Sequence, residues 1–141
     1  KHGGNVIAVE QVDPALAHKF GIVSLAEGKD GPLITGMVEK PAPGTAPSNL
    51  FISGRYVLQP EVFTYLENQK PGAGGEIQLT DAIISLLGSQ EIRPFEFTGR
   101  TFDCGSPAGF VGANLHMALG RDGVREAVFE EIRLYEAGHK H

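Results

Sequence analysis

The sequence has a single cysteine, Cys104, among its 141 residues. One thiol excludes an internal disulfide, and the lack of a second cysteine excludes a structural zinc site built on sulfur. The five histidines form no cluster with acids or with Cys104 at metal-ligand spacing, so we interpret them as surface or packing residues. Because a lone cysteine is typical of a reducing compartment, we expect a cytoplasmic protein.

Basic residues and long apolar runs are also scarce. Lys and Arg number 12 against 17 Asp and Glu, which gives a formal net charge of −5. Since a surface that binds duplex nucleic acid must neutralise many phosphates, this balance argues against a nucleic-acid partner. No apolar run is long enough to cross a bilayer, and residues 1–4 begin no signal segment. We therefore expect no nucleic-acid partner and no membrane partner.

The residues that are present indicate one globular domain over residues 1–141. Hydrophobic residues make up 41% of the chain, enough for a core at this length. Lys1 is not an initiator methionine, and residues 5–10 have the pattern of a strand from the outset. We therefore expect this chain to be a piece of a longer protein.

Strand and helix patterns alternate along the chain. The β-rich segments predict strands over residues 6–12, 21–25, 33–38, 50–58 and 93–97. Turn residues at 29–32 join the second and third strands into a hairpin, while the proline-rich residues 41–47 predict a surface loop. This order predicts an α/β fold in which an antiparallel hairpin belongs to a mixed sheet.

Helical periodicity marks four longer segments and one short one. Asp13 before Pro14 predicts a short capped helix. Pro60 opens a helix with Val62, Phe63 and Leu66 on one face. A second helix has Leu79, Ile83, Leu86 and Leu87 on its apolar face and ends at Gly88. This helix and the one that begins at Pro60 would both cover the sheet. Ser106-Pro107 caps a third, and a fourth carries the apolar stripe Val124, Val128, Ile132 and Tyr135.

Polar residues follow two of the predicted strands. Glu39-Lys40-Pro41 ends one strand, and Asp103 follows another. Ligands of α/β sheets bind beyond strand ends, so these residues are candidates for chemistry. A third candidate is the glycine-rich run 72–81, which leads through Glu76 and Gln78 into a helix start that suits a sugar phosphate.

Each candidate has a plainer interpretation. Glu39-Lys40 beside a proline is, in isolation, more often a solvated strand end. Asp103 before Gly105 and Ser106 is equally turn chemistry next to a helix cap. The glycine-rich run taken alone is equally a flexible connection between helices.

The motifs together resemble the C-terminal half of the bacterial glucose-1-phosphate uridylyltransferases, or UDP-glucose pyrophosphorylases, of the sugar nucleotidyltransferase family. The resemblance runs nearly end to end. It is carried by residues 4–10, 20–23, 38–41, 47–50, 54–58, 70–81, 103–105 and 109–110. The Glu-Lys-Pro triplet occurs across the family, whereas residues 71–81 are typical of the uridylyltransferase branch. The family's N-terminal Gly-Thr-Arg loop and first metal-binding aspartate have no counterpart in this sequence.

The resemblance implies an enzyme of Rossmann-like fold that transfers a uridylyl group from UTP to glucose 1-phosphate, giving UDP-glucose and pyrophosphate. It implies that Lys40 neutralises a sugar phosphate oxygen, Glu39 accepts hydrogen bonds from glucose hydroxyls, and Gly21 lets the backbone approach the sugar. Asp103 would be one of two carboxylates on Mg²⁺. Weaker carry-over places further residues on the sugar side: Asn49, Arg55, Glu76 and Gln78.

Further expectations follow from the resemblance. Family members are oligomers, so part of the stripe over residues 124–135 is expected to meet another subunit of a homo-oligomer. The chain alone is expected to be inactive because half of the phosphate-binding apparatus is missing. Two alternatives stay open: a nucleotidyltransferase for another base or sugar, such as a thymidylyltransferase, and a non-catalytic sugar-phosphate binding module.

Overall fold

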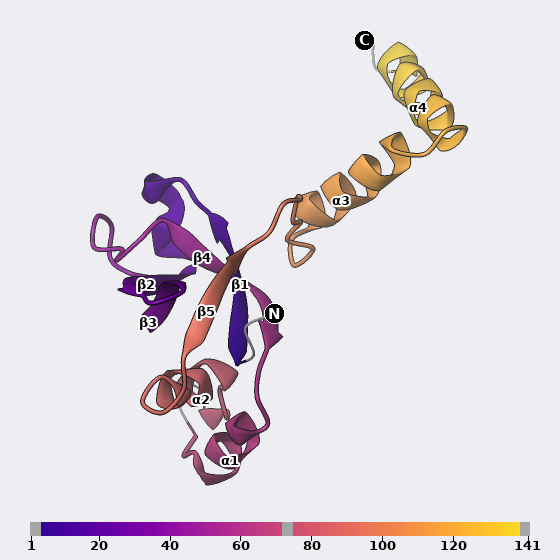
Figure 1. Cartoon of the computed structure of the whole chain (residues 1–141). Helices are drawn as coiled ribbons and strands as arrows, with labels where there is room; N and C mark the ends of the chain where they lie inside the picture. Colours follow the sequence, from indigo (N-terminus) through magenta and orange to yellow (C-terminus); the bar gives the residue numbers. More distant parts are fainter. Residues whose placement is uncertain (1–3, 72–74, 139–141) are drawn as a thin grey trace. The chain divides into compact units, whose positions relative to one another are not determined.

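The computed structural model describes residues 4–71 and 75–138 (Figure 1). The chain divides into two compact units, Lys1–Thr98 and Gly99–His141, and each is treated by itself below. Among the described residues, no helix is both long enough and apolar enough to span a membrane.

The first unit contains a five-stranded mixed sheet. Its strands are β1 (Asn5–Gln11), β2 (Gly21–Gly28), β3 (Gly31–Glu39), β4 (Leu50–Val57) and β5 (Ile92–Glu96), in the order β3-β2-β4-β1-β5. β5 runs parallel to β1, and the other pairs are antiparallel. The remaining elements are a 3-10 helix, η1 (Pro14–Lys19), and the helices α1 (Glu61–Asn68) and α2 (Leu79–Leu86). The predicted strands, the capped turn after Asp13 and the mixed sheet are confirmed.

The hairpin of β2 and β3 is held at its turn. Arg93 of β5 donates a hydrogen bond from Nη1 to the carbonyl of Asp30 at 3.0 Å. Gly31, with φ of 109°, closes the turn in a conformation that favours glycine. At the opposite end of the hairpin, Gly21 pairs with Glu39. This register brings the first residue of β2 beside the last residue of β3.

The core lies between the sheet and the helices α1 and α2. Its fully or nearly fully buried side chains are Ile7, Val9, Val23, Ile34, Val62, Ala82, Ile83, Leu86 and Ile92. In β1 the buried residues alternate, as expected for a strand with one face on the core. The prediction for Phe63 is wrong, since its side chain is 64% exposed. The inward face of α1 is instead formed by Val62, Tyr65 and Leu66, which follow the i, i+3, i+4 spacing.

A buried asparagine joins three segments of the first unit. Asn5 is only 1% exposed. Its Nδ2 donates to Oε1 of Gln90 at 2.8 Å, and its Oδ1 accepts from the backbone N–H of Gln59 at 2.8 Å. Because an unpaired buried amide is costly, these bonds fix the start of β1 to the segments before α1 and β5.

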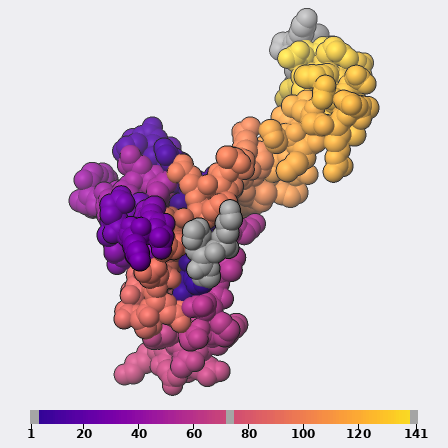
Figure 2. All heavy atoms as spheres, viewed as in Figure 1, coloured from indigo at the N-terminus to yellow at the C-terminus, as the bar shows by residue number. Residues whose placement is uncertain are grey.

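The second unit contains the helices α3 (Pro107–Leu119) and α4 (Val124–Gly138), orange to yellow in Figure 2. Ser106 caps α3 by accepting a hydrogen bond at Oγ from the N–H of Gly109 at 3.1 Å, as predicted. Gly123, with φ of 80°, lies in the break before α4. Neither helix contains a buried residue, so large apolar side chains such as Phe110 and Ile132 remain exposed.

Candidate active site

The hairpin register places the carboxylate of Glu39 directly over Gly21. A Cβ built on Gly21 would lie 2.9 Å from Oε2 of Glu39 and 3.8 Å from Cδ1 of Ile52. A side chain at residue 21 would displace this carboxylate, which the exposed Glu39 side chain allows. The absence of a side chain at Gly21 therefore lets the carboxylate rest over the backbone of β2, and the φ of Gly21 is not in the left-handed region.

Lys40 is held in an unusual backbone conformation next to this carboxylate. Its φ is 46°, and it is the sole non-glycine residue with positive φ in the described parts of the chain. The N–H of Lys40 donates to the carbonyl of Phe20 at 3.0 Å, which extends the hairpin pairing beyond β3. A left-handed conformation costs a residue with a Cβ about 1–2 kcal/mol. Such strain is often found at functional sites.

The charged groups of Lys40 and Glu39 form a loose pair. Nζ of Lys40 lies 3.9 Å from Oε1 of Glu39, and the two side chains are 67% and 70% exposed. An exposed pair of this kind contributes little to stability because water competes with each partner. Both groups are therefore available to a ligand that carries hydroxyls and an anionic phosphate.

Tyr56, which sequence reasoning missed as a site residue, is influenced by the charge of Glu39. Burial, and then the negative charge of Glu39, raise the pKa of the Tyr56 phenol. The phenol is therefore protonated at neutral pH and can donate a hydrogen bond. Tyr56 follows a β-bulge in β4: Val9 pairs with Ile52, but Ile7 pairs with Tyr56, and Gly54 has φ of 76°. Ile52 and Tyr56 both pack against the hydrophobic core.

The other sugar-side candidates of the first unit are spread along β4. Asn49 is exposed just before β4, where its carbonyl accepts from the N–H of Val12 at 2.9 Å. Its neighbour Ser48 donates to the carbonyl of Val23, two residues along β2 from Gly21. Arg55 is exposed in the β4 bulge and donates to the carbonyl of Gly54 at 3.3 Å. Roles for Asn49 and Arg55 on the sugar side stay predictions.

Glu76 and Gln78 lie immediately before α2. Residues 72–74 of the glycine-rich run are outside the described part of the chain. Glu76 is exposed, and Gln78 is the N-cap residue of α2, although its side chain makes no capping bond. The carbonyl of Gln78 accepts from Nε2 of Gln69 at 3.0 Å. The predicted helix start is confirmed, and the roles of both residues stay predictions.

Asp103 belongs to the second unit, whereas Glu39 and Lys40 belong to the first. Its Oδ1 accepts a hydrogen bond from the N–H of Gly105 at 2.9 Å, so the turn expected from the sequence is present. The described residues contain no group of three or more His, Cys, Asp or Glu side chains that could hold a metal. A single exposed carboxylate still suits Mg²⁺, because this ion keeps several waters and takes only one or two carboxylates beside phosphate.

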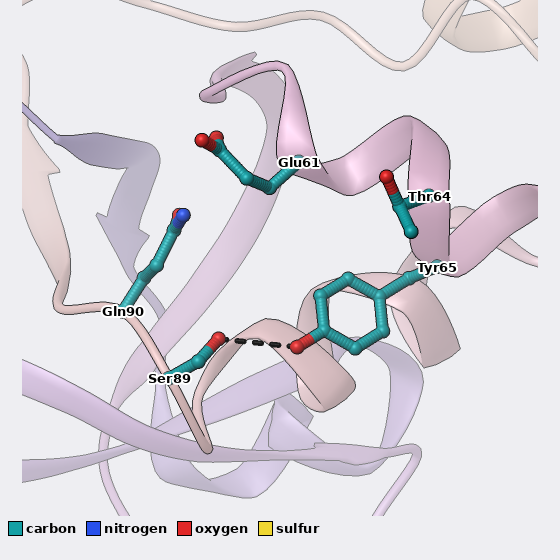
Figure 3. A pocket seen from close by; sticks show the side chains of 5 residues that line it. All are labelled: Glu61, Thr64, Tyr65, Ser89 and Gln90. Carbon is teal, nitrogen blue, oxygen red and sulfur yellow. Dashed lines mark hydrogen bonds between the residues drawn. The ribbon is translucent and has the colours of Figure 1, made fainter.

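Two hollows in the first unit lie on either side of Ser89 and Gln90. The smaller one, of about 310 Å³, is lined by Glu61, Thr64, Tyr65, Ser89 and Gln90 (Figure 3). In it the Tyr65 hydroxyl and the Ser89 hydroxyl are 3.1 Å apart and hydrogen-bonded. The larger one, of about 470 Å³, is lined by Leu33, Ile34, Thr35, Leu87, Ser89, Gln90 and Glu91. None of the predicted site residues lines either hollow.

Comparison with known proteins identifies the family. The family described as "Nucleotidyl transferase" matches residues 1–119. This chain belongs to that family. It is 44% identical over 133 residues to UTP–glucose-1-phosphate uridylyltransferase 2 of Staphylococcus saprophyticus, which covers 93% of this chain and 46% of that protein. The chain thus spans about half the length of this curated relative.

Solved structures of the nucleotidyltransferase family have the same fold. The UTP-bound UGPase from Acinetobacter baumannii superposes with a TM-score of 0.78 and 38% identity, over 93% of this chain and 45% of that one. A UDP-glucose pyrophosphorylase complexed with UDP-glucose gives a TM-score of 0.73 and 36% identity, over 84% of this chain and 45% of that one. The family resemblance and the α/β fold expected from the sequence are confirmed, whereas the assignment to the C-terminal half stays a prediction.

The backbone strain at Lys40 can be measured with a pair of substitutions. Lys40→Gly should be more stable to urea than Lys40→Ala by about 0.5–1 kcal/mol, because relief of the left-handed strain outweighs the added entropy of an unfolded glycine. The matched pair Lys29→Gly and Lys29→Ala, in the turn of the same hairpin, should show no gain for glycine. Equal unfolding midpoints for the two Lys40 variants would contradict the strain.

The electrostatic contact between Glu39 and Tyr56 predicts a shift in titration. Glu39→Gln removes the negative charge, so the pKa of Tyr56 should fall, yet it should stay above the ordinary value because burial is the larger cause. NMR titration of ¹³C-labelled tyrosine would report it. Glu27→Gln, elsewhere on the hairpin, serves as the control and should leave this pKa unchanged. A Tyr56 pKa that is identical in all three proteins argues against the contact.

Proposed function

We propose that this chain supplies the sugar-binding, metal-contributing C-terminal portion of an enzyme that transfers a uridylyl group from UTP to glucose 1-phosphate. The family match and the 44% identity to a uridylyltransferase support the reaction class. The observation that carries the proposal is local: a carboxylate lies over a glycine and beside an exposed ammonium.

The reaction needs positioning and charge neutralisation more than acid-base catalysis. A phosphate oxygen of glucose 1-phosphate attacks the α-phosphorus of UTP, and the bond from this phosphorus to the oxygen bridging the β-phosphorus breaks. UDP-glucose forms and pyrophosphate leaves. The nucleophile is already an anion, so the main obstacle is repulsion between phosphates. No proton has to be removed from the attacking oxygen.

The hairpin end is suited to the sugar phosphate. The oxygens of Glu39 accept hydrogen bonds from glucose hydroxyls, and the missing side chain of Gly21 leaves space for the ring. Tyr56 donates a further hydrogen bond from its protonated phenol. Lys40 neutralises a phosphate oxygen, because a compact ammonium suits a single oxygen. When the sugar phosphate binds, these contacts replace the loose ion pair between Lys40 and Glu39, and the loss of that exposed pair costs little free energy.

The remaining predicted residues are assigned secondary roles. Asn49, Arg55, Glu76 and Gln78 line or orient the sugar side. Asp103 is one carboxylate for Mg²⁺, with the second carboxylate supplied by the part of the enzyme that the chain does not cover. When bound, Mg²⁺ neutralises phosphate charge near the reacting phosphorus. The exposed thiol of Cys104 is consistent with a cytoplasmic enzyme.

The proposal is tested on the complete enzyme with a panel of nucleoside triphosphates. UTP should be the preferred donor, and the 141-residue chain alone should form no UDP-glucose. Lys40→Ala should raise KM for glucose 1-phosphate about tenfold, the effect of roughly 1.4 kcal/mol, with little change in KM for UTP. Lys29→Ala, at the other end of the hairpin, is the matched control and should leave both constants unchanged.

Several outcomes would contradict the proposed function. Preference for another nucleotide would move the enzyme to a different branch of the family. If Lys40→Ala raised KM equally for glucose 1-phosphate and for UTP, the assignment of Lys40 to the sugar phosphate would be wrong. Turnover by the 141-residue chain would show that no further segment is needed.

The proposed enzyme is a homo-oligomer that uses α4 as a contact between copies. The family match ends at residue 119, the end of α3, so α4 lies outside the residues that this match covers. Its stripe of Val124, Ile132 and Tyr135 is nevertheless more than 40% exposed at each residue. Apolar surface of this kind is typical of a subunit contact.

Molar mass measured by light scattering tests the α4 contact in the complete enzyme. Ile132→Lys should lower the mass to that of a smaller assembly, because a buried contact would then hold an unpaired charge. Glu131→Lys, at the adjacent position outside the stripe, should leave the mass unchanged. A monomeric enzyme, or an Ile132→Lys variant of unchanged mass, would refute this contact.

A further inference from the structure

Phe102, next to Asp103, contacts two other planar side chains. The guanidinium carbon of Arg100 is 4.8 Å from the centroid of the Phe102 ring. The centroid of the His116 ring, on α3, is 5.1 Å from the centroid of the Phe102 ring, and the two ring planes are tilted by 44°. Both distances are in the range of favourable cation–π and aromatic contacts. The three side chains are defined here as the Phe102 stack.

The backbone of Asp103 also lies close against α3. A Cβ on Gly109 would overlap the carbonyl oxygen of Asp103, so α3 approaches this carbonyl as closely as its glycine allows. Oδ1 of Asp103 is held by the N–H of Gly105, and the Ser106 hydroxyl accepts from the N–H of Gly109. These contacts fix the first turn of α3 relative to Asp103.

The Phe102 stack adds a contact further along the same helix. His116 is on the third turn of α3, whereas Gly109 is on the first. Phe102 is half-buried, although α3 and α4 have no buried residue that could hold the segment by a core. The stack therefore supplies a side-chain anchor that the second unit does not obtain from hydrophobic packing.

We propose that Phe102 is a positioning residue for Asp103: the Phe102 stack fixes the direction in which the Asp103 carboxylate is presented to a divalent cation. The inference rests on the proposed function, in which Asp103 binds Mg²⁺. Oδ1 is already engaged by Gly105, so the orientation of Oδ2 depends on the backbone that Phe102 holds. Groups that orient a metal ligand change metal affinity by about 10–100-fold when they are removed.

The test is direct binding of Mn²⁺ to the complete enzyme saturated with UDP-glucose, with free Mn²⁺ followed by EPR. Phe102→Leu keeps apolar volume but abolishes stacking, and it should weaken Mn²⁺ binding about tenfold. Phe102→Tyr keeps the ring and should bind within about twofold of the wild type. Phe129→Leu, the same substitution on α4, is the matched control and should bind as the wild type does.

Two further variants keep the test decisive if Phe102→Leu does not fold. Arg100→Met and His116→Leu leave the ring in place and remove one of its partners, and each should weaken Mn²⁺ binding by a smaller factor, about threefold. The KM for Mg²⁺ should rise in the same order, with kcat recovered at excess Mg²⁺.

Other results would overturn the inference and separate it from the proposed function. A Phe102→Leu protein that melts at lower temperature but binds Mn²⁺ normally when folded would show a purely structural role. Unchanged Mn²⁺ binding in Arg100→Met and His116→Leu would likewise show that the Phe102 stack does not orient Asp103. In both cases the wild type still makes UDP-glucose. A wild-type enzyme that neither binds Mn²⁺ nor makes UDP-glucose would instead overturn the proposed function together with the inference.

Discussion

The close approach between the Glu39 carboxylate and Gly21 is the constraint on which the candidate site depends. It arises from the missing side chain at the start of β2 and from a pairing register that brings Glu39 opposite it. A slip of one residue would turn Glu39 to the other face of the sheet. The register is fixed far from the site, where Gly31 closes the turn and Arg93 binds the carbonyl of Asp30. The local chemistry thus depends on the whole length of the hairpin.

The backbone of the candidate site is joined to the core through neighbouring strands of the sheet. Ile52 approaches Gly21 and also packs against the hydrophobic core, while Tyr56 packs on that core and senses the charge of Glu39. The helices α1 and α2 stabilise the apolar part. The strained backbone of Lys40 is then tolerated because the paired hairpin before it and the bond from its N–H to the carbonyl of Phe20 hold its conformation.

The sequence predicted the elements well, because strand alternation, prolines and glycines act locally. It predicted the hairpin of the second and third strands through the turn at residues 29–32. Phe63 was placed wrongly because the side of a short helix that faces the sheet depends on tertiary packing. Tyr56 was missed because its relation to the charge of Glu39 depends on the order of the strands in the sheet, which no local pattern shows. The roles of Asn49, Arg55, Glu76 and Gln78 remain predictions.

The two units hold their acidic side chains in different ways, and the difference follows from what each carboxylate is proposed to bind. Glu39 is placed by a strand register and stays exposed, which suits hydroxyls that exchange with water at little cost. Asp103 is held at its own oxygen by Gly105 and through the neighbouring ring of Phe102, without support from a buried core. A divalent cation demands defined ligand geometry, so a carboxylate for Mg²⁺ gains more from such fixing than one that binds a sugar.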